Sequence, residues 1–289
     1  MTPTYNRAKT LPKLYKSLLN QTSKNFEWLI IDDGSTDNTK TIIENYINER
    51  AVKIRYFYKN NGGKHTALNF GFRIIQSELT FIVDSDDYLT NNAIEMIEKK
   101  WETYKYSKEI CGICFLRGKS EFECIGDKFP NTSTLSYIDM RIKNKISGDK
   151  AEIFRTSILK NKSFPEISGE KFIGEDYIWC DIGKEYLMAW CNDIIYICNY
   201  LDGGLSLSGK KLRIRCPIGG MLNSSMMLTK EFPFYFRIKK AILYNCYYLF
   251  AEKNRRSEGY TNKGKFLRYL TFPFGVALYY FWKYKYSDK

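Results

Sequence analysis

The sequence contains a single histidine, His65, among its 289 residues. A metal site built from several histidines is therefore excluded, and one histidine also argues against a Ser-His-Asp triad. Any general base must then be a carboxylate, a lysine, a tyrosine or a cysteine. The scarcity of histidine directs the search for chemistry to the acidic side chains.

Long apolar runs are also missing. The longest apolar stretch extends from Leu270 to Trp282, well short of the ~20 residues that a membrane-spanning helix needs. No apolar segment follows the N-terminus, so no signal peptide is expected. These absences predict a cytoplasmic protein that is either soluble or peripheral on the inner face of the cell membrane.

The eight cysteines do not cluster as they do in a disulfide framework, and the chain is not a small secreted domain. Cys111 and Cys114 form the only close pair, and no second Cys-x-x-Cys completes a zinc site. We expect reduced, structural thiols. A redox or metal role for this pair is the alternative.

Acidic residues are scarce near the C-terminus. Residues 210–289 hold 17 Lys and Arg but four Asp and Glu, whereas residues 1–209 hold 28 of each kind, so the net charge of +13 belongs to the last eighty residues. This change in composition predicts two parts. Residues 1–209 would be a catalytic domain, with halves at 1–90 and 91–209, and residues 210–289 a basic, aromatic, helical region.

Apolar periodicity predicts alternating strands and helices in the first part of the chain. Strands are expected at 28–31, 52–58, 80–83 and 110–116, and helices at 11–19, 38–50, 67–75 and 92–104. Such alternation is typical of an α/β fold with a mostly parallel sheet and right-handed crossovers. Residues 1–7 are expected to form a turn, and residues 119–147 give only a weak, mixed signal.

A further helix is expected from Glu175 through Leu187, after a turn at Ser168-Gly169. A strand should follow from Ile194 to Tyr200, and Gly203-Gly204 would break it. Specificity is expected to lie in the weakly patterned segment 119–175.

Three acids directly follow an apolar run in Phe81-Ile82-Val83-Asp84-Ser85-Asp86-Asp87. The run is typical of a buried parallel strand, and ligands bind at the carboxyl end of such strands. Asp84 and Asp86 would point to the same side of extended backbone, where two carboxylates repel each other unless Mg²⁺ or Mn²⁺ lies between them. The alternative is a cluster that favours the next helix start. One acid would satisfy that need, so we favour the metal interpretation.

A second acidic strand end is Asp32-Asp33-Gly34-Ser35-Thr36-Asp37. Its glycine spacing does not match an EF-hand. Paired acids at neighbouring strand ends suit a nucleotide, and a capped turn is the alternative. The loop Asn61-Gly62-Gly63-Lys64 lacks the Walker spacing, although its glycines allow close backbone approach and Lys64 could meet a phosphate. We expect His65 at the surface or beside that phosphate.

Asp176 is the best candidate for a general base, because Gly174-Glu175-Asp176 lies at a helix start after a glycine-marked turn. The alternative is an ordinary acid favoured by the helix dipole.

Five motifs occur in a fixed order: Pro3-Thr4-Tyr5-Asn6-Arg7, Asp32 to Asp37, Asn61-x-Gly63 with Ala67-x-Asn69-x-Gly71, Asp84 to Asp87, and Glu175-Asp176. Together they resemble family 2 glycosyltransferases of the GT-A fold over about residues 3–180. The resemblance implies an inverting, metal-dependent transferase (EC 2.4) that takes a sugar from a nucleotide diphosphate, usually UDP, with Mn²⁺ or Mg²⁺.

The resemblance also implies residue roles. Asp176 would be the catalytic base and Asp86 the metal ligand. The substrate-binding residues would be Pro3, Tyr5, Asp32, Asp33, Lys64, Asp84 and Glu175. Within that set, Tyr5 would pack on the base, Asp33 recognise it, Lys64 face the base or diphosphate, and Asp84 face the ribose. The acceptor would be a hydroxyl of a glycan or polyprenyl-linked molecule in cell-surface polysaccharide synthesis.

The sequence departs from the family at its start. Family members usually carry an apolar strand before the Pro-Thr-Tyr-Asn turn, whereas only Met1 and Thr2 precede it here. The first strand is therefore expected to be missing, and coding sequence upstream of Met1 is expected to supply about five apolar residues.

Two other functions compete with this interpretation. A haloacid-dehalogenase-like phosphatase would use Asp84 as nucleophile and Asp86 as acid, but that motif normally opens a chain and leaves Asp32-Asp33 unexplained. A catalytically inactive, membrane-associated partner protein with the same fold is the second alternative.

The basic region also carries 19 of the 47 aromatic residues, all between Phe232 and Tyr286. Its apolar segment, flanked by Arg268 and Lys283, fits a helix at an anionic membrane surface. Packing of these helices on the catalytic domain is the first alternative. Binding of single-stranded nucleic acid is the second, but no such motif is present and no nucleic-acid partner is expected.

Overall fold

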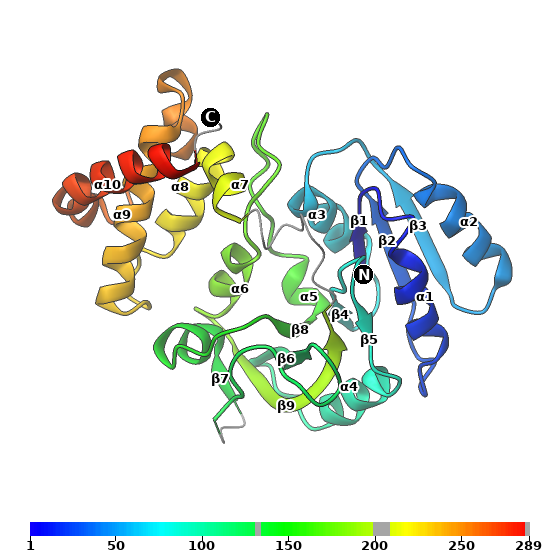
Figure 1. The fold of residues 1–289 in the computed structure, drawn as a ribbon. Coiled ribbons are helices and arrows are strands. Elements are labelled where there is room, and N and C mark those ends of the chain that lie inside the picture. Colours follow the sequence, from blue (N-terminus) through cyan, green and yellow to red (C-terminus); the bar gives the residue numbers. More distant parts are fainter. Residues whose placement is uncertain (131–133, 199–208, 287–289) are drawn as a thin grey trace. The chain divides into compact units, whose positions relative to one another are not determined.

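The computed structural model describes residues 1–130, 134–198 and 209–286 (Figure 1). The chain divides into two compact units, which we describe separately. The first unit comprises Met1–Ser163 and Glu185–Leu201, and the second comprises Phe164–Lys184 and Asp202–Lys289. This division differs from the boundary predicted at residue 209, because Phe164–Lys184 belongs with the C-terminal helices. The predicted two halves of the first part remain a prediction.

A three-stranded parallel sheet opens the first unit. Its strands are β1 (Thr2–Thr4), β2 (Trp28–Asp32) and β3 (Ile54–Tyr58), in that spatial order. The crossover helices are α1 (Leu11–Leu19) and α2 (Thr39–Glu49), and α3 (Lys64–Ile74) follows β3. The predicted β-α-β alternation is confirmed here. Apolar residues of α1 such as Leu11 and Leu14 are fully buried, as their spacing predicts.

The expectation that the first strand is missing is wrong for the residues present. Thr2 pairs with Ile30 and Thr4 with Asp32, so a short β1 forms where a turn was predicted. The Met1 amine donates to the Phe81 oxygen at 2.7 Å, and the Met1 oxygen accepts from the Val83 amide at 3.0 Å. This alternation is the hydrogen-bond pattern of a parallel pair. Met1 therefore lies between β2 and the residues that precede the acidic loop.

The second sheet is mixed rather than parallel. It contains β4 (Leu79–Phe81), β8 (Lys150–Arg155), β6 (Ile110–Gly118), β9 (Leu187–Ile197) and β5 (Tyr88–Leu89), with β7 (Thr134–Ser136) paired to β9. Among the described strands of this sheet, β6 and β9 are the one parallel pair. The prediction that the strand before Asp84 lies in a parallel ladder is therefore incomplete, because β4 pairs antiparallel with β8. Overall, the predicted α/β fold with a helix-flanked central sheet is confirmed.

The other described helices of this unit are α4 (Ala93–Glu102), the π-helix η1 (Ile138–Lys143) and α5 (Thr156–Leu159). The main core joins buried side chains of α1, β2 and α4 to those of the second sheet, Ile113 and Ile153 among them. All eight cysteines are free thiols. Burial raises the pKa of Cys111 to about 12, which opposes the thiolate form that a redox role would need.

The second unit is helical in its described part. It contains α6 (Asp176–Ile182), α7 (Gly209–Arg215), α8 (Pro217–Met226), α9 (Phe234–Phe250), the 3-10 helix η2 (Lys253–Gly259) and α10 (Lys265–Tyr286). The helix predicted from Glu175 ends at Ile182, five residues early. The predicted break at Gly203-Gly204 lies outside the described residues.

The apolar segment of α10 is divided between core and solvent. Trp282 packs edge-to-face on Tyr247 and is buried, whereas Phe266, Tyr269 and Phe274 are exposed. Arg268, predicted to flank a lipid-facing segment, is buried and lies over the Tyr244 ring instead. That prediction is wrong for this residue. Among the described helices, none is both long and apolar enough to cross a bilayer.

Candidate active site

The first unit brings the predicted motif loops of the N-terminal half together at strand ends. Asp32 closes β2, and Asp33 follows it. The turn after β1 reaches the same loop, because the Asn6 amide donates to the Ser35 hydroxyl at 2.8 Å and the Asn6 side-chain oxygen accepts from the Thr36 amide at 2.8 Å. Asn6 adopts a left-handed backbone with φ of 52°, a conformation that asparagine tolerates. Pro3 is buried and Tyr5 is exposed.

Asp32 is completely buried and holds this loop from within. Its carboxylate accepts from the Tyr56 hydroxyl and from the Ser35 amide, each at 2.8 Å. A buried carboxylate needs such donors to offset its lost hydration. These two hydrogen bonds fix the loop that follows β2.

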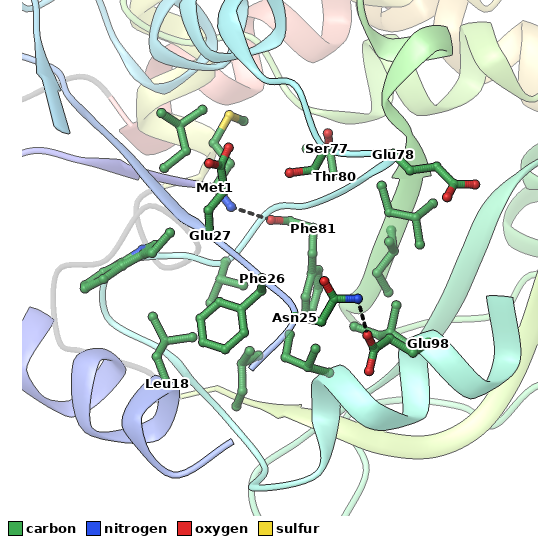
Figure 2. A pocket seen from close by; sticks show the side chains of 18 of the residues that line it. Met1, Leu18, Asn25, Phe26, Glu27, Ser77, Glu78, Thr80, Phe81 and Glu98 are labelled. Atoms are coloured by element: carbon green, nitrogen blue, oxygen red, sulfur yellow. Dashed lines mark hydrogen bonds between the residues drawn. The ribbon is translucent and has the colours of Figure 1, made fainter. Parts of the chain in front are cut away.

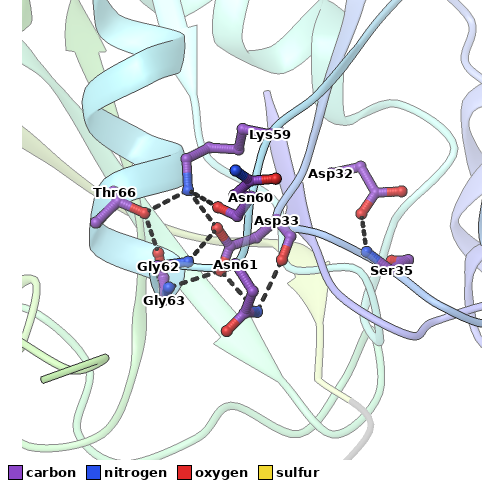
Figure 3. Close-up of polar contacts among 9 residues, drawn as sticks. All are labelled: Asp32, Asp33, Ser35, Lys59, Asn60, Asn61, Gly62, Gly63 and Thr66. Atoms are coloured by element: carbon purple, nitrogen blue, oxygen red, sulfur yellow. Dashed lines mark hydrogen bonds and ion pairs between the residues drawn. The ribbon is translucent and has the colours of Figure 1, made fainter. Parts of the chain in front are cut away.

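Asp33 fixes the glycine loop that follows β3 (Figure 3). Its oxygens accept from the Gly62 amide at 3.0 Å, the Gly63 amide at 2.7 Å, and the Asn61 side chain at 3.2 Å. Gly34 is needed beside it, because a Cβ added there would lie 2.8 Å from the Asn61 nitrogen and the backbone has φ of 88°. Asp33 thus joins the end of β2 to the start of α3.

Lys59 completes this cluster, although it belongs to none of the sequence motifs. Its ammonium donates to Asp33 at 2.6 Å, to the Asn60 carbonyl at 2.6 Å and to the Thr66 hydroxyl at 2.8 Å (Figure 3). Because Asp33 is only 3% exposed, this ion pair is largely screened from water. Lys59 therefore neutralises the acid that the family resemblance assigns to base recognition.

Asp84 lies between two cations. Lys64 from the first turn of α3 forms an ion pair with one oxygen, and Arg117 from the end of β6 lies 3.3 Å from the other. Burial opposes ionisation of Asp84, but the Lys64 ammonium and the Arg117 guanidinium together hold its pKa well below the usual range. The predicted surface position of His65, next to Lys64, is wrong, because His65 is 2% exposed. Its alternative position beside a phosphate stays a prediction.

Tyr196, on β9, positions the backbone of the same acidic loop. Its hydroxyl accepts from the Asp84 amide at 2.9 Å and donates to the Asp87 carboxylate at 2.8 Å. Arg117 lies over the Tyr196 ring at 4.0 Å from its centroid. Neither residue was found from sequence, since both come from strands about 30 to 110 positions further along the chain.

Asp86 differs from Asp84 and Asp87 in how weakly its carboxylate is paired, whereas its exposure is close to the 22% of the Asp84 side chain. It is 23% exposed, and one oxygen lies 3.5 Å from the guanidinium of Arg7, longer than a good charge-assisted hydrogen bond. No group of three or more acidic, histidine or cysteine side chains that could hold a metal is found in the described part of the chain. A cation here would thus be held by Asp86 and by ligand oxygens, a mode that suits Mg²⁺ and Mn²⁺.

Asp176 and Glu175 belong to the second unit. Asp176 begins α6, and one of its oxygens accepts from the Asn223 side chain at 2.9 Å while the other lies 3.7 Å from the Lys240 ammonium. The carboxylate remains 40% exposed beside a cavity of about 40 Å³. Asn223 and Lys240 come from α8 and α9, and no sequence pattern linked them to Asp176. Glu175 occupies the N-cap position of α6, as the predicted helix start implies.

Comparisons with known proteins identify the family of this chain. The family model "Glycosyl transferase family 2" matches residues 1–155. The GalNAc(5)-diNAcBac-PP-undecaprenol beta-1,3-glucosyltransferase of Campylobacter jejuni is 31% identical over 63% of this chain and 58% of its own length. Staphylococcus aureus TarP, a poly(ribitol-phosphate) beta-N-acetylglucosaminyltransferase, is 36% identical over 37% of this chain and 32% of its own length. The chain thus spans less than two thirds of these relatives.

Solved structures share the fold at low identity. S. aureus TarS 1–349 in complex with UDP has a TM-score of 0.60 at 19% identity, covering 92% of this chain and 75% of that protein. The mannosyltransferase PcManGT from Pyrobaculum calidifontis, in complex with GDP-Man and Mn²⁺, has a TM-score of 0.58 at 13% identity, covering 96% and 85%. With more than half of its residues matched by the family model, the chain belongs to glycosyl transferase family 2.

Proposed function

We propose that the protein is an inverting glycosyltransferase that takes a sugar from a UDP-sugar and transfers it to a hydroxyl group of a lipid-linked or glycan acceptor. Asp86 carries this proposal. In an acidic loop where Asp84 is paired with two cations and Asp87 with Tyr196, it alone presents its carboxylate with a single long ion pair. Such a group suits a cation that a diphosphate brings with it.

The N-terminal loops suit a nucleotide. Tyr5 offers an exposed ring that can pack on a base, and Asp33 lies at the adjacent strand end. Since both Asp33 oxygens already accept hydrogen bonds from Lys59 and the glycine loop, a base N–H would share or replace one of these donors. Lys64 and Arg117 place positive charge beside Asp84, where a ribose or a diphosphate would lie.

The proposed chemistry is a single displacement. Asp176 removes the proton of the acceptor hydroxyl, the oxygen attacks the anomeric carbon, and the nucleoside diphosphate leaves from the opposite face. This inverts the anomeric centre and needs no covalent nucleophile. A divalent cation at Asp86, when bound, offsets charge on the diphosphate. The hydrogen bond from Asn223 orients Asp176, and its 40% exposure leaves room for an acceptor.

The acceptor class is suggested by the Campylobacter relative, whose name specifies an undecaprenyl diphosphate-linked glycan. A lipid-linked acceptor requires the enzyme to work at a membrane surface. The basic region supports this, since exposed aromatic side chains on α10 lie among lysines such as Lys283 and Lys285. We propose a peripheral position on the inner face of the cell membrane.

A donor screen tests the proposal. Purified protein is incubated with UDP-, GDP- and dTDP-sugars and a polyprenyl diphosphate-linked glycan, with Mn²⁺ or with EDTA, and nucleotide release is measured. We expect release from a UDP-sugar that depends on both acceptor and metal. Hydrolysis of phosphomonoesters would instead indicate a phosphatase. No nucleotide release with any donor and acceptor would indicate a catalytically inactive protein.

A further inference from the structure

Two hollows in the structure differ in character. Most residues that line the cavity of about 700 Å³ beside Met1 are apolar, Leu18 and Phe26 among them (Figure 2). The pocket beside Asp176, in the second unit, measures about 40 Å³ and has charged walls. Its lining combines the segment before α6 with side chains from α7, α8 and α9, among them Arg213, Asn223 and Lys240.

Positive charge exceeds negative charge in the pocket beside Asp176. Asp176 supplies one negative charge, whereas Arg213 and Lys240 supply two positive charges, and no other described residue of the lining is charged at neutral pH. Glu170 lies nearby, but its carboxylate accepts from two backbone amides at the start of α8, at 2.8 and 2.7 Å. The pocket therefore attracts an anion even with the proposed base beside it.

Both cations have donors to spare. The Lys240 side chain is 12% exposed, and its ammonium lies 3.7 Å from Asp176 and 3.4 Å from the Asn223 oxygen. These distances are longer than a good charge-assisted hydrogen bond, and an ammonium has three donors. Arg213 is exposed and makes no ion pair with a described acid, and its guanidinium lies 6.0 Å from the centre of the Phe172 ring. Acceptor oxygens are what this pair of cations lacks.

The volume of the pocket limits what these cations can bind. A buried water needs about 10–15 Å³ of such space, so 40 Å³ holds roughly three waters. That is close to the bulk of one phosphate group and less than a sugar ring. Gly174 keeps this space open, because a Cβ added there would collide with a carboxylate oxygen of Asp176. The pocket is therefore suited to a single small anionic group.

We propose that the pocket binds a single phosphate group of the acceptor, held by Arg213 and Lys240, next to the hydroxyl whose proton Asp176 removes. This inference rests on the proposed transfer reaction and specifies its acceptor. Because the pocket adjoins Asp176, the phosphate lies within a few bonds of the reacting hydroxyl, as in a polyol phosphate or a sugar phosphate. A diphosphate, with two such groups, exceeds the volume of the pocket.

The arrangement explains how an anionic acceptor can approach a carboxylate. The phosphate and Asp176 repel each other, and Lys240, which contacts Asp176, offsets this repulsion. Arg213 can donate two hydrogen bonds to one phosphate and so fix its orientation. Holding the phosphate in this way places the neighbouring hydroxyl at Asp176. An acceptor without the phosphate leaves both cations unpaired and is disfavoured.

The experiment measures phosphate binding by the full chain without a sugar donor and with EDTA present. Inorganic phosphate, glycerol 3-phosphate, pyrophosphate and glycerol are titrated separately, and Kd is obtained from the rise of Tm with ligand concentration. The variants are Arg213→Gln, Lys240→Gln and Asp176→Asn. Lys239→Gln, at an exposed lysine of the same helix, is the control. Arg213 is itself exposed, so its replacement leaves the fold intact.

We expect phosphate and glycerol 3-phosphate to bind, with Kd about tenfold higher in Arg213→Gln and in Lys240→Gln. Asp176→Asn should lower Kd by about threefold, because it removes the repelling charge. Lys239→Gln should match the wild type, and glycerol should not bind. Equal Kd in Arg213→Gln and wild type would place the phosphate elsewhere and overturn the proposal, as would the absence of saturable binding.

Tighter binding of pyrophosphate that depends on Arg213 would overturn the assignment to a single phosphate and indicate a diphosphate. The outcome is distinct from that of the donor screen. Arg213-dependent phosphate binding by a protein that uses no sugar donor would leave the site and refute the transfer reaction. Sugar transfer by a protein that binds neither phosphate would do the reverse.

Discussion

The guanidinium of Arg117 lies 3.3 Å from the carboxylate of Asp84 and stacks over the ring of Tyr196. Tyr196 in turn holds the Asp84 amide and the Asp87 carboxylate. Two strands of the second sheet thus set the backbone and charge of the acidic loop. Because this network engages Asp84 and Asp87, Asp86 is left with one long ion pair, 3.5 Å to the Arg7 guanidinium.

Arg117→Met should lower the free energy of unfolding by about 2 kcal/mol at pH 7, less than for a fully buried pair because Asp84 is 22% exposed. The pKa of Asp84 is lower in the folded state than in the unfolded state, so its ionised form stabilises the fold at neutral pH. This contribution is lost as pH falls toward the folded-state pKa.

Urea unfolding at pH 7 and pH 3 measures the effect of this variant. The difference from the wild type should shrink at the lower pH. Lys119→Met, which removes an exposed i,i+4 ion pair with Glu123 just beyond β6, is the control and should change stability by less than about 0.5 kcal/mol. An equal loss at both pH values would assign the Arg117 effect to packing on Tyr196 rather than to charge.

Asp86→Asn should reduce turnover by on the order of 10³-fold, because an amide no longer attracts the cation that balances the diphosphate charge. Its Tm should match the wild type, since Asp86 makes one long contact with Arg7. Asp193→Asn, at an exposed carboxylate of β9, is the matched control and should leave turnover unchanged. Wild-type turnover by purified Asp86→Asn protein would disprove the metal role.

Asp176→Asn should bind the donor normally and lose transfer by roughly 10² to 10⁴-fold, the contribution typical of a general base. Calorimetric titration with the UDP-sugar and a product assay separate the two effects. Asp181→Asn, on the same helix and paired with Lys184, is the control. Collapse of donor affinity in Asp176→Asn would make Asp176 a binding residue instead.

The free Met1 amine should make stability depend on pH. Its pKa is about 5 in the folded chain and near 8.0 when unfolded, so the unfolded state binds more protons between these values. The free energy of unfolding should therefore rise from pH 5 to pH 8, by at most about 4 kcal/mol. Nα-acetylation should flatten this rise. Parallel pH profiles for the free and acetylated chains would contradict the prediction.

Replacing Phe266 and Phe274 with Ser should weaken binding to phosphatidylglycerol liposomes, because both side chains are exposed and lie eight residues apart on one face of α10. Co-sedimentation at low and high salt measures the loss. Phe122→Ser, at a fully exposed aromatic of the first unit, should have no effect. No binding by the wild type at low salt would refute the membrane proposal.

Sequence alone located the two acidic loops correctly. An apolar run followed by acids marks a buried strand end, and both Asp32-Asp33 and Asp84 to Asp87 follow such runs in the structure. The early helices were predicted within a few residues, because buried positions recur with the helical period.

Local sequence patterns did not predict the strands that pair with distant parts of the chain. β8 was not predicted, and β9 begins seven residues before the predicted strand, because a strand in a mixed sheet is stabilised by partners far away in sequence. The same reason explains the wrong prediction for Arg268. A basic residue beside an apolar run is expected at the surface, but Arg268 packs on the Tyr244 ring and donates to the Thr261 carbonyl.

The chemical identity of the acidic loops was thus determined by the sequence, since the type and order of side chains at a strand end are local properties. The tertiary structure decided how each acid is used. Lys59 and Arg117, which carry no motif, reach Asp33 and Asp84 only when distant segments pack together. Because ion pairs depend on distances of a few ångströms, their partners follow from the fold and not from spacing along the chain.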